Sequence, residues 1–260
     1  MTKYLKAMPL VFLGVFILTT QLFAQDVSSD QASGHVEGAR YMQLLGTMGM
    51  GYAHNKDMDD RIEGLGDNAA DQYNTLGGTS AFKNDFLTSR LTYGVDLDFR
   101  YLGKSLGMGG SIGFHQCRAE STVSGKGWAD KFTFRSTLSV VPVTGTLYYR
   151  GNIDADSFLL FGVGAGYYMA TFKEEWEDED TLPLDQSLSE TIKTNTVGYH
   201  LKIEYNYVLD SGITFAGGIL GRYVNYDKFK NDNVEILYKG KSLEAGLTGI
   251  SIYLSAGISL

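Results

Sequence analysis

The chain has 260 residues, of which 43% are hydrophobic, and its formal net charge is −8. A single cysteine, Cys117, excludes an intramolecular disulfide and a zinc site built from several cysteines. The acidic balance argues against a nucleic-acid-binding protein, which needs a basic surface for the phosphate backbone. Aromatic residues make up 13% of the chain, a composition that does not suit a disordered protein.

The first 24 residues have the layout of a cleaved secretory signal peptide. Lys3 and Lys6 precede the apolar run 7–18, and the small residue Ala24 offers a cleavage site. The apolar run is too short for a transmembrane helix, which needs about 20 residues. We therefore expect export and removal of residues 1–24, with an uncleaved N-terminal membrane anchor as the alternative.

After Ala24 the sequence has the periodicity of β-strands. No run approaches 18 consecutive apolar residues, so no transmembrane helix is predicted. Apolar and polar residues instead alternate with a period of two, which gives a strand two different faces. Eight long runs show this character, at about 41–54, 89–102, 106–121, 131–150, 157–173, 191–209, 213–229 and 242–260.

The connections between these runs alternate in length. Short ones fall at 103–105, 151–156 and 210–212, and longer ones at about 55–88, 122–130, 174–190 and 230–241. Short periplasmic turns and long extracellular loops are typical of outer-membrane barrels. The pattern predicts an all-β fold, an eight-stranded antiparallel up-and-down transmembrane β-barrel formed by residues 40–260, with residues 25–39 as a flexible periplasmic lead-in. A soluble secreted sandwich is the alternative.

The polar face of the predicted strands carries charges of both signs among many small residues. Because an eight-stranded barrel has an interior that side chains can fill, we expect these charges to point into the lumen and to pair with one another. Unpaired charges would be costly to bury there. The predicted lumen polar network consists of Asp96, Asp98, Arg100, Arg135, His200, Lys202, Glu204 and Arg222.

Three segments resemble a known family. They are Val141–Tyr149 (VPVTGTLYY), Leu160–Tyr167 (LFGVGAGY) and Leu209–Thr214 (LDSGIT), and they are similar to the central strand pair and a late periplasmic turn of the small OmpA/OmpX/OmpW-like outer-membrane barrels. The resemblance implies location in the outer membrane and assembly by the barrel-assembly machinery. That family usually ends in an aromatic residue, whereas this chain ends in Leu260.

Acidic residues are concentrated in one predicted extracellular loop. Residues 173–190 contain eight acids and one base. We expect this loop either to be a solvated anionic surface or to bind divalent cations weakly and bridge them to lipopolysaccharide, because hard cations prefer carboxylate and phosphate oxygens. The central acids are Glu174, Glu175, Glu177, Asp178, Glu179 and Asp180.

The histidines argue against a lipid A-modifying enzyme. A PagL-like deacylase needs a His-x-Ser pair, and none of the four histidines begins one. We therefore predict no catalytic residue, no metal site and no cofactor, and we expect a monomer that contacts outer-membrane lipid and lipopolysaccharide.

The function favoured by the sequence is that of a non-enzymatic outer-membrane barrel with an envelope-structural or surface-interaction role through its extracellular loops. The alternative is an OmpW-like conduit for small hydrophobic molecules. Such a conduit needs an apolar lumen segment, for which Leu160, Tyr168, Leu220 and Tyr253 are the candidates.

Overall fold

The computed structural model describes most of the predicted barrel. The described residues are 41–77, 82–87, 90–125, 131–178, 188–226, 230–231, 234–235, 237–238, 241–242 and 245–260. The predicted signal peptide (1–24) and lead-in (25–39) lie outside them. Within the described part of the chain, no helix is both long and apolar enough to cross a membrane.

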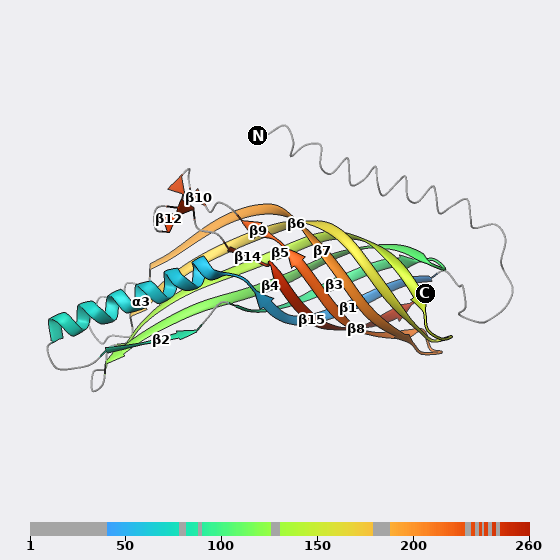
Figure 1. The fold of residues 1–260 in the computed structure, drawn as a ribbon, viewed down its shortest axis with the longest axis horizontal. Helices are drawn as coiled ribbons and strands as arrows, with labels where there is room; N and C mark the ends of the chain where they lie inside the picture. The colour runs from blue at the N-terminus through green and yellow to red at the C-terminus, as the bar shows by residue number, and fades with distance from the viewer. Residues whose placement is uncertain are drawn as a thin grey trace. The chain divides into compact units, whose positions relative to one another are not determined.

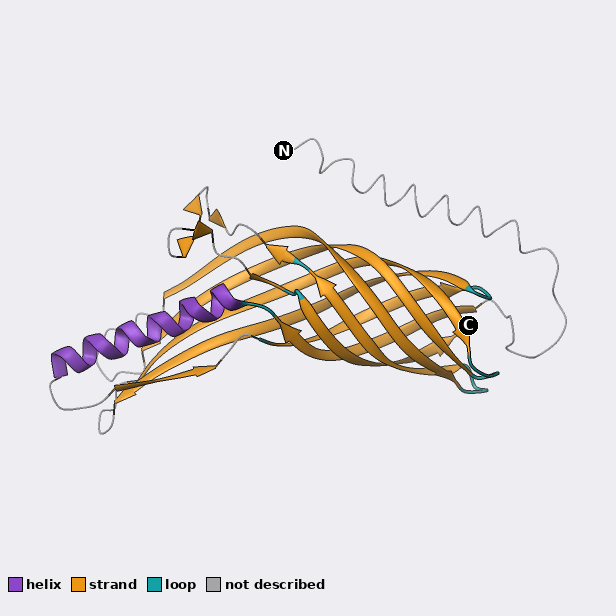
Figure 2. Ribbon diagram, in the orientation of Figure 1, coloured by secondary structure: helices purple, strands orange, loops and turns teal. Residues whose placement is uncertain are grey.

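Eight long strands form a closed antiparallel ring (Figures 1 and 2). They are β1 (Tyr41–Ala53), β3 (Leu91–Leu102), β4 (Leu106–Gly125), β5 (Lys131–Asn152), β6 (Ser157–Asp178), β7 (Leu188–Val208), β8 (Ile213–Tyr223) and β15 (Gly249–Ser259). Around the ring they follow the order β4-β3-β1-β15-β8-β7-β6-β5, and β5 pairs back with β4. The predicted fold class, an eight-stranded up-and-down barrel, is confirmed.

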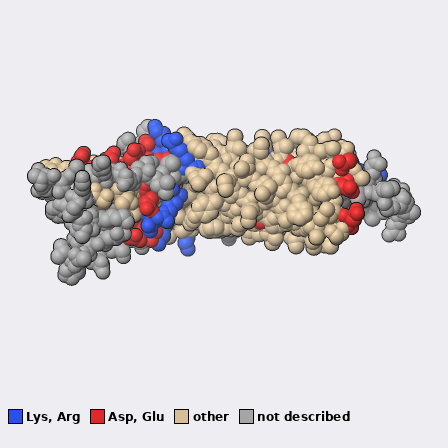
Figure 3. Space-filling model, turned by 90° about the horizontal axis from the view of Figure 1, so that it is seen from below, with Lys and Arg blue, Asp and Glu red and all other residues tan. Residues whose placement is uncertain are grey.

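The two faces of each strand differ as the alternation predicts. On β3, Thr92, Asp98 and Arg100 are buried inside the ring, whereas Tyr93 and Val95 between them are exposed on the outside. Exposed outward side chains on the other ring strands are likewise mostly apolar, and together they form the broad uncharged band in Figure 3. A barrel with an apolar outer band and a polar interior is suited to lipid outside and paired polar groups inside.

The three predicted short turns lie at one end of the ring, with the C-terminus (Figure 1). One of them joins β7 to β8, where the N–H of Gly212 donates to the carbonyl of Leu209 at 2.8 Å. Gly212 has a φ of 79°, a conformation that residues with a Cβ rarely adopt. The glycine in this sequence therefore permits the turn to be short.

At the opposite end, β4, β6 and β7 continue further than the sequence predicts, whereas β5 begins at Lys131 as predicted. Their upper parts do not show apolar alternation, because this part of the wall carries Thr, Lys and Glu on its outer face rather than apolar residues. The predicted loop 174–190 therefore begins as strand: β6 extends to Asp178, and β7 starts at Leu188.

The predicted loop 55–88 is also largely regular structure. It contains the helix α3 (Lys56–Gly77) and the strand β2 (Phe82–Leu87), which pairs with β4 beyond the end of β3. Asp57 and Asp59 lie in the first turn of α3, where negative charge is favoured by the helix dipole. Met58 and Ile62, one turn apart, place the apolar face of the helix against the strands. Figure 2 shows α3 alongside the extended strands.

The last two predicted runs are each interrupted. After β8 the chain forms the short strand β9 (Asn225–Tyr226), and β14 (Ala245–Gly246) precedes β15. At the interruption, the hydroxyl of Thr248 accepts from the N–H of Val224 at 3.0 Å and donates to the carbonyl of Val224 at 3.2 Å. Between these strands lie the two-residue strands β10 (Lys230–Asn231), β11 (Val234–Glu235), β12 (Leu237–Tyr238) and β13 (Lys241–Ser242).

The register predicts how neighbouring positions of β15 react with a thiol reagent. In a Cys117→Ser background, Leu254→Cys should react with a lipid-soluble maleimide in membranes, because Leu254 is 68% exposed on the outer face. Ser255→Cys should react much more slowly, because Ser255 is 5% exposed and faces the lumen. The reverse order of rates would mean that the strand is shifted by one residue, since such a shift exchanges the two faces.

Candidate functional site

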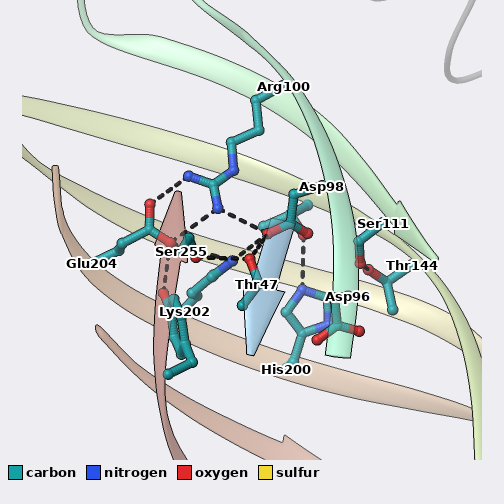
Figure 4. A network of polar contacts seen from close by, with 12 residues as sticks. Thr47, Asp96, Asp98, Arg100, Ser111, Thr144, His200, Lys202, Glu204 and Ser255 are labelled. Carbon is teal, nitrogen blue, oxygen red and sulfur yellow. Dashed lines mark hydrogen bonds and ion pairs between the residues drawn. The ribbon is translucent and has the colours of Figure 1, made fainter. Parts of the chain in front are cut away.

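A charged network crosses the middle of the lumen. Asp98 and Arg100 are on β3, and Lys202 and Glu204 are on β7, four places away around the ring in either direction. Figure 4 shows these four side chains pointing toward one another. Arg100 donates to both carboxylate oxygens of Glu204, one of them at 3.0 Å, and to Asp98 at 3.0 Å. Lys202 lies 3.2 Å from the same oxygen of Asp98. The network therefore joins opposite walls of the barrel.

Hydroxyl groups from two more strands complete this network. Tyr253 on β15 donates to Glu204 at 2.8 Å, and Thr47 on β1 donates to Asp98 at 3.2 Å. Thr47 and Ser255 are themselves 2.7 Å apart. Arg100 and Glu204 are fully buried, and burying a charge is costly unless its partners replace the lost water. The added hydroxyls help to meet that requirement.

A second layer of polar contacts crosses the lumen on the extracellular side of the first. His115 on β4 and Arg222 on β8 are also four places apart in the ring, and Nη2 of Arg222 lies 3.2 Å from Nε2 of His115. Asp96 on β3 contacts both, at 2.9 Å from His115 and 3.7 Å from Arg222. His200 on β7 lies 2.8 Å from the hydroxyl of Thr146. The lumen is thus bridged twice.

The structure brings seven of the eight predicted network residues into the lumen, and the expectation for Arg135 is wrong. On β5 the buried inward side chains are those at even positions, such as Ser136, and Arg135 is on the outer face. There it donates to Glu120 at 3.1 Å and to Glu177 at 3.3 Å. Partial burial alone would raise the pKa of Glu120, but hydrogen bonds from Arg118 and Arg135 outweigh it and hold that pKa below its ordinary value.

The sequence did not assign His115 or Thr47 to the network. Both lie in strands where the alternation is weak, because β4 carries four glycines between Gly107 and Gly113 and β1 carries three glycines. A signal for His115 was nonetheless present. Cys117 and Ala119 alternate with the charged Arg118 and Glu120, which indicates that the odd positions of β4, including His115, face inward.

An apolar cap closes the extracellular end of the lumen. Met58 and Ile62 of α3 are fully buried against side chains of the ring, among them Cys117, Leu138 and Phe172. Helix α3 packs mainly on β4, β2 and β5. We call this cluster the α3 cap. Its presence means that the lumen ends in packed side chains, not in an open mouth.

Buried polar contacts hold the α3 cap in place. Arg61 on α3 forms two hydrogen bonds to the carboxylate of Glu174 on β6, at 2.7 and 3.0 Å, and Ser136 donates to the same carboxylate at 3.3 Å. Before the helix, the side chain of Asn55 donates to the sulfur of Cys117 and accepts from the N–H of Gly246. The helix and the residue before it are therefore joined to β6, β4 and β14.

The predicted acidic loop is corrected by these contacts. Glu174, Glu175, Glu177 and Asp178 belong to β6, whereas Glu179 and Asp180 lie outside the described residues. Glu174 faces inward to Arg61, while Glu175 and Glu177 face outward and pair with Lys173 and Arg135. Within the described part of the chain, no group of His, Cys, Asp or Glu is arranged to hold a metal ion.

The cavities among the described charged residues of the lumen are small. Two cavities, of about 20 and 30 Å³, lie among the charged residues, and each has room for little more than water. A larger concavity of about 520 Å³ surrounds the small pair Gly46 and Ala256 and includes the exposed apolar Met48, Phe215 and Leu254. The β1–β15 and β15–β8 ladders continue unbroken through this concavity, so it is a depression in the wall.

The closed ring, apolar outer band and charged lumen define a small eight-stranded transmembrane β-barrel, which is the fold that the resemblance to the OmpA/OmpX/OmpW-like barrels implies. No model of a known protein family matches this chain, and no curated protein matches it.

Several solved structures are similar to the chain. OprG from Pseudomonas aeruginosa is 13% identical, with 87% of this chain and 98% of that chain covered and a TM-score of 0.44. A major outer membrane protein from Thermus thermophilus is 12% identical, with 84% and 99% covered and a TM-score of 0.40. Ail of Yersinia pestis, in complex with the heparin analogue sucrose octasulfate, is 14% identical, with 86% and 99% covered and a TM-score of 0.33. These similarities are weak and concern the fold alone.

The central network predicts a large cost for removing one partner. Arg100→Ala leaves the two buried carboxylates of Glu204 and Asp98 with a single cation, Lys202, between them, and we expect a loss of about 3–5 kcal/mol in the free energy of unfolding. Urea unfolding of the protein in lipid vesicles measures it. Arg135→Ala, which removes only outward contacts at the surface, is the matched control and should cost less than about 1 kcal/mol. Equal costs for the two variants would contradict the assignment.

The ion pair of the α3 cap predicts a local effect. Arg61→Ala leaves Glu174 buried without its charged partner, so helix α3 should detach and become sensitive to protease while the ring stays folded. Limited proteolysis reports the detachment of α3, and the gel migration of unheated samples reports whether the ring stays folded. Lys56→Ala is the control, because Lys56 is 65% exposed and its ion pair within the described residues is with Asp60 along the helix, which is worth a few tenths of a kcal/mol. Protection of α3 in the Arg61→Ala variant would show that the pair is dispensable.

Proposed function

We propose that this protein is a non-enzymatic outer-membrane barrel that holds a folded platform at the cell surface, in an envelope-structural or surface-interaction role. The surface platform consists of the upper parts of β4 to β7 together with β2 and α3. The single observation that carries the proposal is the α3 cap, because it joins the long strands into one packed body while closing the lumen beneath it. A barrel built in this way holds the surface platform outside the membrane.

The filled lumen favours this role over that of an OmpW-like conduit. Of the four candidate apolar lumen residues, Leu160 packs near the periplasmic end with Phe158, and Tyr168 belongs to the α3 cap. Tyr253 donates a hydrogen bond to Glu204 in the charged network of the lumen. Leu220 lies beside the charged residues Lys202 and Arg222. These four residues do not form a continuous apolar path.

The histidine contacts support the non-enzymatic part of the proposal. His200 and His115 are buried in the lumen with Thr146, Asp96 and Arg222 as their neighbours. A general base must reach the proton of a bound substrate, and these two side chains lie beneath the α3 cap.

The proposal includes the route to the membrane. Residues 1–24 are removed as a signal peptide, residues 25–39 remain in the periplasm, and the barrel-assembly machinery inserts a monomer into the outer membrane. Leu260 takes part in ring closure, because its N–H and carbonyl both bond to Met42, at 2.8 and 3.0 Å. The backbone of this last residue makes the contacts of a closing strand, although its side chain is not aromatic.

Bilayer and uptake measurements test the proposal against the conduit. The wild-type protein should give no stable conductance in planar bilayers, and a deletion strain should take up small hydrophobic solutes normally. The same strain should lose detergent resistance or surface adhesion. Wild-type protein should restore it, but a variant with α3 replaced by a flexible linker of equal length should not. Clear conductance, or loss of solute uptake, would favour the conduit.

A further inference from the structure

Cationic side chains gather on the outer face of the barrel where the apolar band ends. On the face drawn in Figure 3, Lys and Arg side chains border the band at one end, and acidic side chains lie beyond them. The register places Arg118 of β4, Lys173 of β6 and Lys193 of β7 on this outer face. We call these three residues the cationic belt.

Hydroxyl groups separate the cations of the belt. Thr137 of β5 pairs with Arg118 on one side and with Lys173 on the other. Thr171 of β6 pairs with Lys193 on the next strand. Neighbouring strands are about 4.8 Å apart, so Arg118 and Lys173 lie roughly 10 Å from each other across one threonine. Cations and hydroxyl donors at this spacing can surround a phosphate group.

The cationic belt lies directly above the lipid-facing surface. Met169 lies two residues before Thr171 on β6 and is an exposed outward apolar side chain, as is Phe114 on β4. Two residues of a strand span about 7 Å. The belt therefore begins at the level where the acyl chains of the outer leaflet end and their phosphate-bearing headgroups start.

The two ends of the band differ in charge. The short turns at the other end carry the acids Asp154, Asp156 and Asp210 and one base, Lys104, and Figure 3 shows acidic side chains at that end of the band. Acids at one boundary and cations at the other match a membrane whose outer leaflet is rich in phosphate.

The belt residues keep unused donors despite their contacts within the chain. Arg118 pairs with Glu120, and Lys173 pairs with Glu175, but their side chains remain 42% and 43% exposed. A guanidinium has five N–H donors and an ammonium has three, so each can accept a second anion. Lys193 is exposed, and no ion pair joins it to another described residue.

We propose that the cationic belt binds the phosphate groups of lipopolysaccharide in the outer leaflet and so fixes the height of the barrel on the side that carries the surface platform. The interaction does not depend on what the platform contacts. Each cation near an anionic lipid surface contributes on the order of a fivefold change in affinity, and exposed charges are screened by salt over about 8 Å at physiological ionic strength.

The test uses the full-length protein in vesicles that contain bisphosphorylated lipid A, dephosphorylated lipid A, or phosphatidylglycerol at matched surface charge. The readout is the temperature at which the unheated gel form is lost. Bisphosphorylated lipid A should raise this temperature for the wild-type protein above that in the other two vesicles. Lys193→Gln should lose part of the rise and the triple variant R118Q/K173Q/K193Q most of it. Lys104→Gln, in a short turn at the other end, should keep it.

Two further variants distinguish phosphate binding by the cationic belt from a belt that forms ion pairs only within the chain. Glu175→Gln frees Lys173 and should increase the rise, whereas a belt that serves only internal ion pairs would show no increase. Lys193→Gln removes none of the described ion pairs, so it remains informative if the triple variant does not fold. An equal rise in wild-type and Lys193→Gln proteins, or an equal rise with phosphatidylglycerol, would overturn the proposal.

Discussion

The charges of the lumen can be buried because each finds a counter-charge on another strand across the barrel. Arg100 reaches from β3 to Glu204 on β7, Lys202 reaches from β7 to Asp98 on β3, and Arg222 on β8 lies 3.7 Å from Asp96 on β3. An eight-stranded ring is narrow enough for such contacts, and a wider ring would leave the same side chains to water. The polar interior and the closed lumen therefore both depend on the small size of the ring.

The same constraint explains why the barrel is better suited to be a support than a channel. Two charged layers cross the lumen, and the α3 cap adds an apolar layer above them. Opening a path would require Arg100 to leave both carboxylates and Met58 to leave its packed site. Each of these changes exposes or unpairs buried groups at a cost of several kcal/mol.

The sequence predicts the ring well because lipid on one side and paired charges on the other enforce a strict alternation. Seven of the eight positions assigned to the interior, such as Asp98 and Lys202, follow from that alternation alone. It fails above the membrane, where both faces of a strand are polar or the inner face meets a helix. There Arg135 is a charged residue like those of the lumen, but its position in the alternation of β5 places it on the outer face. Glu174 belongs to an acidic run that resembles a loop, yet it is a buried residue of β6 that pairs with Arg61 of α3. The position of α3 depends on contacts with strands distant in the chain, which a local pattern does not contain.

The pairing within each strand has a consequence for assembly. Asp98 and Arg100 lie two residues apart on β3, and Lys202 and Glu204 lie two residues apart on β7, so each strand carries its own compensating charge. Gln43 and Ser259, joined by a hydrogen bond of 3.2 Å, are 216 positions apart, and loops of that length make ring closure a late event. Before ring closure, the charged side chains of β3 and β7 lack the contacts that they make with each other across the lumen. These two pairs therefore bring no net charge into a half-formed ring, whereas Asp96 on β3 finds its cation, Arg222, only on β8.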